Sequence, residues 1–190
     1  MDLILITDSL ENTRPLLRIA SKEHYRIMKL IESNDDASRY VASLRPDVLI
    51  FMSDEINRMV LQQMRAVTEK APTPIIVFTR DSKAESIDAA VKAGASTYVV
   101  DCHDPQRLKS LIGVAQARFS EQQRLKTKLA KTKNALNDRK NVEKAKGIIM
   151  ETKSLTEDQA YNSLRKLAMN HNKRIGEISE QIISAAKVLV

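Results

Sequence analysis

Five short apolar runs, separated by segments of helical periodicity, fill the first 115 residues and restrict the fold more than any other feature. These runs are residues 3–7, 26–32, 47–51, 74–79 and 97–101. Between the third and fourth runs, apolar residues recur at helical spacing at Ile56, Met59, Val60, Met64 and Val67. Strands that alternate with helices form a parallel sheet with helices on both faces. We therefore predict an α/β domain with a five-stranded parallel sheet over residues 1–115.

A long helix is predicted to follow this domain. From Pro105 to about Thr152 the chain has no further proline, and Asp104 is a favourable N-cap before Pro105. Apolar residues repeat there in a heptad rhythm that includes Ile112 and Phe119, and after a phase break the rhythm resumes with Leu125, Leu129 and Leu136. A single exposed helix of this kind is marginally stable, so we predict a homodimer through a coiled coil, with residues 116–140 as the linker. The alternative is a helix that folds back on its own domain.

The last segment, residues 141–190, is predicted to form a three-helix bundle with the end of the long helix. Thr156 and Gln159 have the spacing of a capping box, and Leu155 is placed to pack against Ala160. The predicted inward residues of the second and third helices are Ala160, Leu164, Leu167, Ala168, Ile175, Ile178, Ile182 and Ala185. A bundle of this size has no room for a deep catalytic pocket.

Charge is divided unevenly along the chain. Residues 1–120 carry 16 Lys and Arg against 16 Asp and Glu, whereas residues 121–190 carry 15 against 8, so the net charge of +7 lies in the C-terminal part. This asymmetry favours a C-terminal part that binds a polyanion. The alternative is that the basic residues only form the solvent-exposed face of a long helix. The N-terminus lacks a basic signal region, no stretch approaches the roughly 20 apolar residues of a membrane span, and Cys102 is the single cysteine. We expect a cytoplasmic protein without a membrane segment.

Ligands of a parallel α/β domain bind beyond the carboxyl ends of the strands. The residues at those ends resemble, in part, the pocket of the flavodoxin-like receiver domain of bacterial response regulators. That pocket uses two acids after the first strand, a phospho-accepting Asp after the third, a Ser or Thr after the fourth and a Lys after the fifth. Asp8 and Thr79 match it, but Thr7, Met52 and Asp101 do not. A thioether is a poor ligand for Mg²⁺, so we predict a receiver-like domain that has lost phosphotransfer.

Asp54 offers an alternative, because it lies two residues after Met52 and could serve as the phosphate acceptor. A response regulator controlled by phosphorylation, with a DNA-binding output, therefore stays open as a second hypothesis. An enzyme is the least favoured class, since the sequence has no glycine-rich phosphate loop, nucleophile elbow or metal cluster. We predict no catalytic residues, no metal site and no cofactor.

Residues 145–150, 155–161 and 164–169 (AKGIIM, LTEDQAY and LRKLAM) resemble the ANTAR domain of transcription antitermination regulators. The whole arrangement is most similar to NasT-type regulators of nitrate and nitrite assimilation. This resemblance implies binding to hairpins in leader RNA, prevention of a terminator, and control by a NasS-like sensor protein. The candidate RNA-binding residues are Lys144, Lys146, Arg165, Lys166, Lys173 and Arg174.

Overall fold

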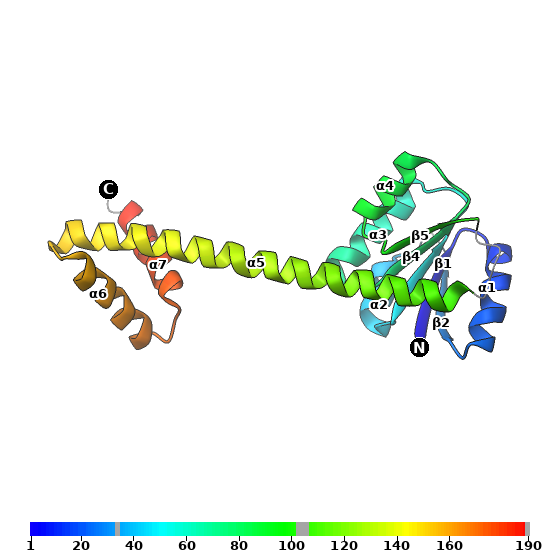
Figure 1. Ribbon diagram of the computed structural model, residues 1–190, viewed down its shortest axis with the longest axis horizontal. Coiled ribbons are helices and arrows are strands. Elements are labelled where there is room, and N and C mark those ends of the chain that lie inside the picture. The colour runs from blue at the N-terminus through cyan, green and yellow to red at the C-terminus, as the bar shows by residue number, and fades with distance from the viewer. Residues whose placement is uncertain (33–34, 102–106, 189–190) are drawn as a thin grey trace. The chain divides into compact units, whose positions relative to one another are not determined.

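The computed structural model describes residues 1–32, 35–101 and 107–188, and it divides into two compact units, Met1–Gln123 and Arg124–Val190 (Figure 1). Cys102 and the predicted N-cap, Asp104 with Pro105, lie outside the described residues. Within the described residues, no helix combines the length and the apolar character needed to cross a membrane.

The first unit contains the predicted parallel sheet. Its strands are β1 (Asp2–Thr7), β2 (Arg26–Glu32), β3 (Val48–Met52), β4 (Ile75–Thr79) and β5 (Thr97–Val100). They are all parallel, in the order β2-β1-β3-β4-β5. The helices between them are α1 (Leu10–Lys22), α2 (Ala37–Leu44), α3 (Arg58–Lys70) and α4 (Ala84–Lys92). The predicted fold class is therefore confirmed, with the strand ends shifted by at most one residue.

Two apolar cores cover the two faces of the sheet. Helices α2, α3 and α4 pack on one face, and α1 and the first turns of α5 (Leu108–Lys153) pack on the other. Ile112 lies in this second core and is only 2% exposed. The prediction that Ile112 belongs to a dimer contact is therefore wrong, because the apolar face at the start of α5 packs on its own sheet.

Gly94 lies just after the end of α4. Its φ of +110° lies in the left-handed region, where an L side chain is disfavoured. A Cβ added to Gly94 would also come within 2.1 Å of Thr68 Oγ1, whose single proton is shared between the Met64 carbonyl at 2.9 Å and the Ala93 carbonyl at 3.0 Å. The glycine is thus required by both backbone conformation and packing, and it sets the turn that leads into β5.

The second unit is a bundle of the C-terminal part of α5 with α6 (Glu157–Asn170) and α7 (Ile175–Val188). The predicted capping box is present, since Gln159 N–H donates to Thr156 Oγ1 while Gln159 Oε1 accepts from Thr156 N–H. Ala145, Ile149, Ala160, Leu164, Ala168 and Ile178 form the buried core.

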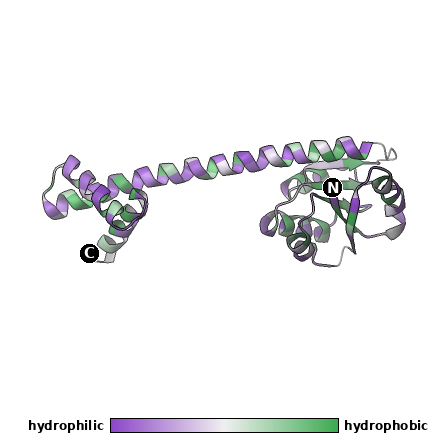
Figure 2. Cartoon of the chain, turned by 90° about the horizontal axis from the view of Figure 1, so that it is seen from below, coloured by the Kyte–Doolittle hydropathy of each residue, from purple (hydrophilic) through white to green (hydrophobic). Residues whose placement is uncertain are grey.

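Two residues predicted to face this core are exposed. Leu167 is 39% exposed, and Ala185 lies on the surface of α7. Their helices bury only a narrow stripe in so small a bundle, and these two positions lie beyond its edge. In Figure 2, hydrophobic colour gathers on the strands and in the bundle core, whereas the middle of α5 is mostly hydrophilic.

Candidate nucleic-acid interface and sheet-edge pocket

Met52 is the last residue of β3, where it pairs with Thr7 of β1 and Phe78 of β4. Its side chain is partly buried and packs against the core on the α1 and α5 face of the sheet. Thr7 is 2% exposed, and its Oγ1 donates to the Ser9 carbonyl at 2.8 Å. Both positions are therefore occupied by side chains with local structural partners, and neither offers a carboxylate.

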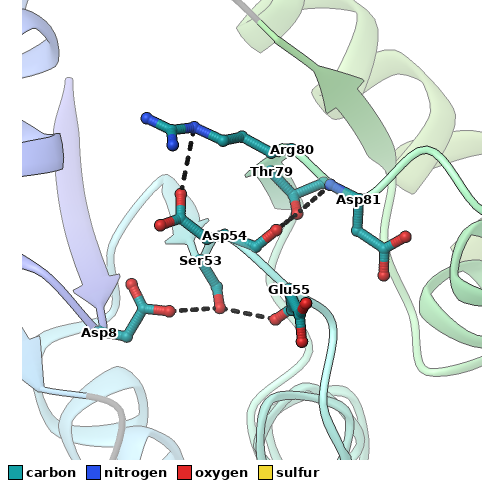
Figure 3. Close-up of polar contacts among 7 residues, drawn as sticks. All are labelled: Asp8, Ser53, Asp54, Glu55, Thr79, Arg80 and Asp81. Atoms are coloured by element: carbon teal, nitrogen blue, oxygen red, sulfur yellow. Dashed lines mark hydrogen bonds and ion pairs between the residues drawn. The ribbon is translucent and has the colours of Figure 1, made fainter.

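Ser53 organises the loop that follows Met52. Its Oγ lies 2.7 Å from Asp8 Oδ2 and 2.7 Å from the Glu55 carbonyl oxygen, so its single proton is donated to one of them at a time (Figure 3). Ser53 is 6% exposed, whereas Asp8 lies on the surface. The carboxylate of Asp8 is thus held by a hydroxyl. Sequence reasoning did not single out Ser53, although its place directly after the third strand marked it as a residue of this edge.

The loop after β4 is tied to the same edge. Thr79 Oγ1 donates to the Asp54 carbonyl at 3.1 Å and accepts from Asp81 N–H at 3.1 Å. Tyr98 Oη on β5 donates to the Asp81 carbonyl at 2.7 Å. Ser86, which hydrogen-bonds the Asp81 side chain, lowers the pKa of that carboxyl below its usual value. Thr79 therefore acts as a structural link between two loops.

Asp54 directs its carboxylate toward Arg80, with 3.4 Å between Oδ1 and Nε (Figure 3). Both side chains are more than half exposed, so the pair contributes little stability. Asp101, which follows β5, has a φ of +47°, and its N–H donates to the Thr79 carbonyl at 3.0 Å. Asp101 brings a carboxylate to the position where a receiver has a cation.

A magnesium ion does not fit this set of residues. Mg²⁺ requires several oxygen ligands in octahedral geometry, and here a thioether stands beside one carboxylate that is hydrogen-bonded to Ser53. No group of three His, Cys, Asp or Glu side chains is placed to hold a metal within the described part of the chain.

Of the six predicted RNA-binding residues, five are exposed: Lys144, Arg165, Lys166, Lys173 and Arg174. Lys146 differs, because its side chain is only 10% exposed. Its Nζ lies 2.6 Å from Glu157 Oε1 and 2.9 Å from Glu143 Oε2. The hydrogen bond from Lys146 lowers the pKa of the Glu157 carboxyl. Lys146 therefore joins α5 to the start of α6, and its assignment to RNA binding is corrected.

A hollow of about 540 Å³ lies at the turn between α6 and α7. It brings together three of the predicted cations, Arg165, Lys173 and Arg174. Its other lining residues, which sequence reasoning did not assign to a site, are Ala168, Met169, Asn172, Ile175 and Glu177. Glu177 Oε2 accepts from Arg174 N–H at 3.1 Å, which fixes the entry into α7. Lys144 and Lys166 lie outside this lining.

The middle of α5 carries leucines on its surface. Leu125, Leu129 and Leu136 are 53%, 70% and 53% exposed, and Phe119 is partly buried. Large apolar side chains repeated in a heptad rhythm on an exposed helix are typical of a coiled-coil seam.

Comparisons with known proteins found one matching family model and relatives that are regulatory proteins. Residues 130–183 match the family model of the ANTAR domain. The transcriptional regulatory protein PdtaR of Mycobacterium tuberculosis is 26% identical over 168 residues, which cover 88% of this chain and 82% of that protein. The nitrate regulatory protein of Klebsiella oxytoca is 38% identical over 124 residues, which cover 65% of this chain but only 31% of that protein.

A solved structure supports the fold of the first unit. The signal receiver domain of a modulated diguanylate cyclase from Desulfovibrio desulfuricans G20 aligns with a TM-score of 0.55. The alignment covers 64% of this chain and 97% of that one, at 16% identity, so it shows the fold alone.

Proposed function

Because this chain is a regulator-like protein that joins a receiver-like domain to an ANTAR domain, we propose that it is an RNA-binding transcription antiterminator. In this proposal the ANTAR bundle binds hairpins of a leader transcript and prevents a terminator from forming. One observation carries the proposal: exposed cations lie around the α6–α7 hollow, within the residues that match the ANTAR model. Basic side chains that contact phosphates, beside a recess for an unpaired base, are what RNA loop recognition requires.

The genes under control are proposed to be those of nitrate or nitrite assimilation. Similarity to the nitrate regulatory protein of Klebsiella oxytoca supports this target. We further propose that a sensor protein of the NasS type controls the antiterminator by binding to it. We propose that this sensor docks on the receiver-like domain. Hydrogen bonds from Ser53 and Thr79 hold the loops at the carboxyl edge of its sheet in place, and an ordered surface of this kind is suited to binding a protein.

The receiver-like domain is expected not to accept a phosphoryl group. Incubation with radiolabelled acetyl phosphate and Mg²⁺ is expected to leave this protein unlabelled, because Met52 offers no acceptor and Asp101, which follows β5, adds a negative charge at the same edge of the sheet. An ordinary receiver domain, labelled in parallel, is the positive control. Stable labelling that disappears in Asp54→Asn would contradict the prediction and support a phosphorylation-controlled regulator.

Gel-shift titration tests whether the protein binds RNA or DNA. It compares leader RNA that contains two hairpins with duplex DNA of equal length. We expect the RNA to bind more tightly, with an affinity that falls as salt rises. Each phosphate contact contributes a slope of about −0.7 to −0.9 in log K against log salt. The five exposed cations therefore predict a slope of roughly −3.5 to −4.5 per bundle. A flat salt dependence or a preference for DNA would overturn the proposed function.

The protein is proposed to act as a homodimer through the surface leucines of α5. The exposure of Leu125, Leu129 and Leu136 supports this, since a partner helix would cover them. A dimer would present two ANTAR bundles to one transcript.

A further inference from the structure

We propose that the hollow at the α6–α7 turn binds one unpaired base of the RNA together with its adjoining phosphate. This inference rests on the proposed function and assigns a specific task to one place in the bundle. The hollow measures about 540 Å³, which lies within the range of about 300–1,000 Å³ found for small-molecule sites. The hollow is shallow and open to solvent, so a single nucleotide can lie against its wall, whereas a duplex would have to bind across the outer surface.

The apolar side of the hollow is suited to the face of a base. Met169 is 72% exposed, and it stands beside the buried Ala168 and the partly buried Ile175. So exposed a methionine contributes little to the core, but its polarizable thioether makes favourable contacts with aromatic rings. The rings in residues 124–190 that could stack on a base, Tyr161 and His171, do not belong to this lining. Met169 is therefore the side chain best placed to cover a base here.

The charged side of the hollow is suited to the phosphate. Arg165, Lys173 and Arg174 provide three cations, and each of them lies on the surface. Guanidinium groups bind phosphate oxygens in a bidentate manner and also stack on bases. The lining thus has an excess of positive charge that complements a nucleic-acid backbone.

The presence of Glu177 in the lining favours the binding of a base in addition to a phosphate. It is the acidic residue of the lining, and its carboxylate accepts from Arg174 N–H at 3.1 Å. A carboxylate repels phosphate, but its remaining lone pairs can accept from the N–H groups at the edge of a base. The mixture of three cations, one carboxylate and an apolar wall matches a whole nucleotide.

The test is a double-mutant cycle between Met169→Ala and abasic positions in the RNA hairpin loop. In the wild-type protein, one abasic position is expected to lower affinity by about tenfold, as is usual when a stacked base is removed. In Met169→Ala, the same abasic position should cost less than about threefold, because the contact has already been removed. Met59→Ala is the matched control, since Met59 is 48% exposed on α3 in the other unit. That variant should keep the full abasic penalty.

Two outcomes would overturn the inference while leaving the proposed function in place. In the first, the RNA binds tightly but no abasic position lowers its affinity by more than about twofold. In the second, an abasic position lowers the affinity of Met169→Ala and of the wild type by the same factor. Failure of the intact hairpin RNA to bind would instead contradict the proposed function itself. Circular dichroism of each variant establishes that a lost effect does not come from an unfolded bundle.

Discussion

Replacing Arg165 and Arg174 together by glutamate is expected to lower affinity for leader hairpin RNA by a hundredfold or more. Both side chains lie on the surface at the α6–α7 hollow, and neither belongs to the bundle core. A hydrogen bond to a charged group contributes about 1.5–3 kcal/mol, so two lost contacts correspond to roughly two to four powers of ten in affinity. The new carboxylates would also repel the phosphates. Filter binding at physiological salt, with circular dichroism for folding, measures the effect.

A control with the same change in net charge separates local contact from long-range attraction. Arg58→Glu with Arg65→Glu alters two exposed arginines of α3, in the first unit. We expect this double variant to lose less than about fivefold in affinity, since these arginines belong to the other unit and line no part of the hollow. Equal losses in the two double variants would contradict the assignment of the ANTAR bundle as the RNA-binding surface.

The sheet could be predicted because strands covered on both faces have nearly continuous apolar sequences. A local signal was equally direct in the capping box of Thr156 and Gln159, where the residue types and their spacing identify the start of a helix. The long helix was harder to interpret. Ile112 and Leu129 lie in two predicted heptad stretches separated by a phase break, and one is 2% exposed whereas the other is 70% exposed. Periodicity identifies an apolar face, but it does not identify the element that covers it.

The candidate site depended still more on contacts between distant residues. Lys144 and Lys146 are two positions apart on α5, and with about 3.6 residues per turn they point in nearly opposite directions. Lys146 is buried because Glu157 of the next helix approaches it, which no local pattern indicates. The α6–α7 hollow likewise arises from the geometry of a turn. Sequence reasoning found its cations by their charge and missed Met169, which resembles a core residue in the sequence.

The double variant Leu125→Lys with Leu129→Lys is expected to be a monomer at concentrations where the unaltered protein is a dimer. These leucines are 53% and 70% exposed on α5. Burial of a leucine side chain contributes about 1.5–3 kcal/mol, and a dimer would bury four of them, so the dimer dissociation constant should rise by a thousandfold or more. Sedimentation equilibrium of the two proteins measures this change.

Thr127→Lys with Ala130→Lys is the matched control, because it adds the same charge at exposed positions of α5 outside the leucine seam. This variant should remain dimeric, and a monomeric unaltered protein would contradict the proposed coiled coil directly. The dimer also has a consequence for RNA binding. Two linked bundles raise the effective concentration of the second contact, so the monomeric variant should lose more affinity for a two-hairpin RNA than for a single hairpin. Equal losses on both RNAs would mean that each bundle acts alone.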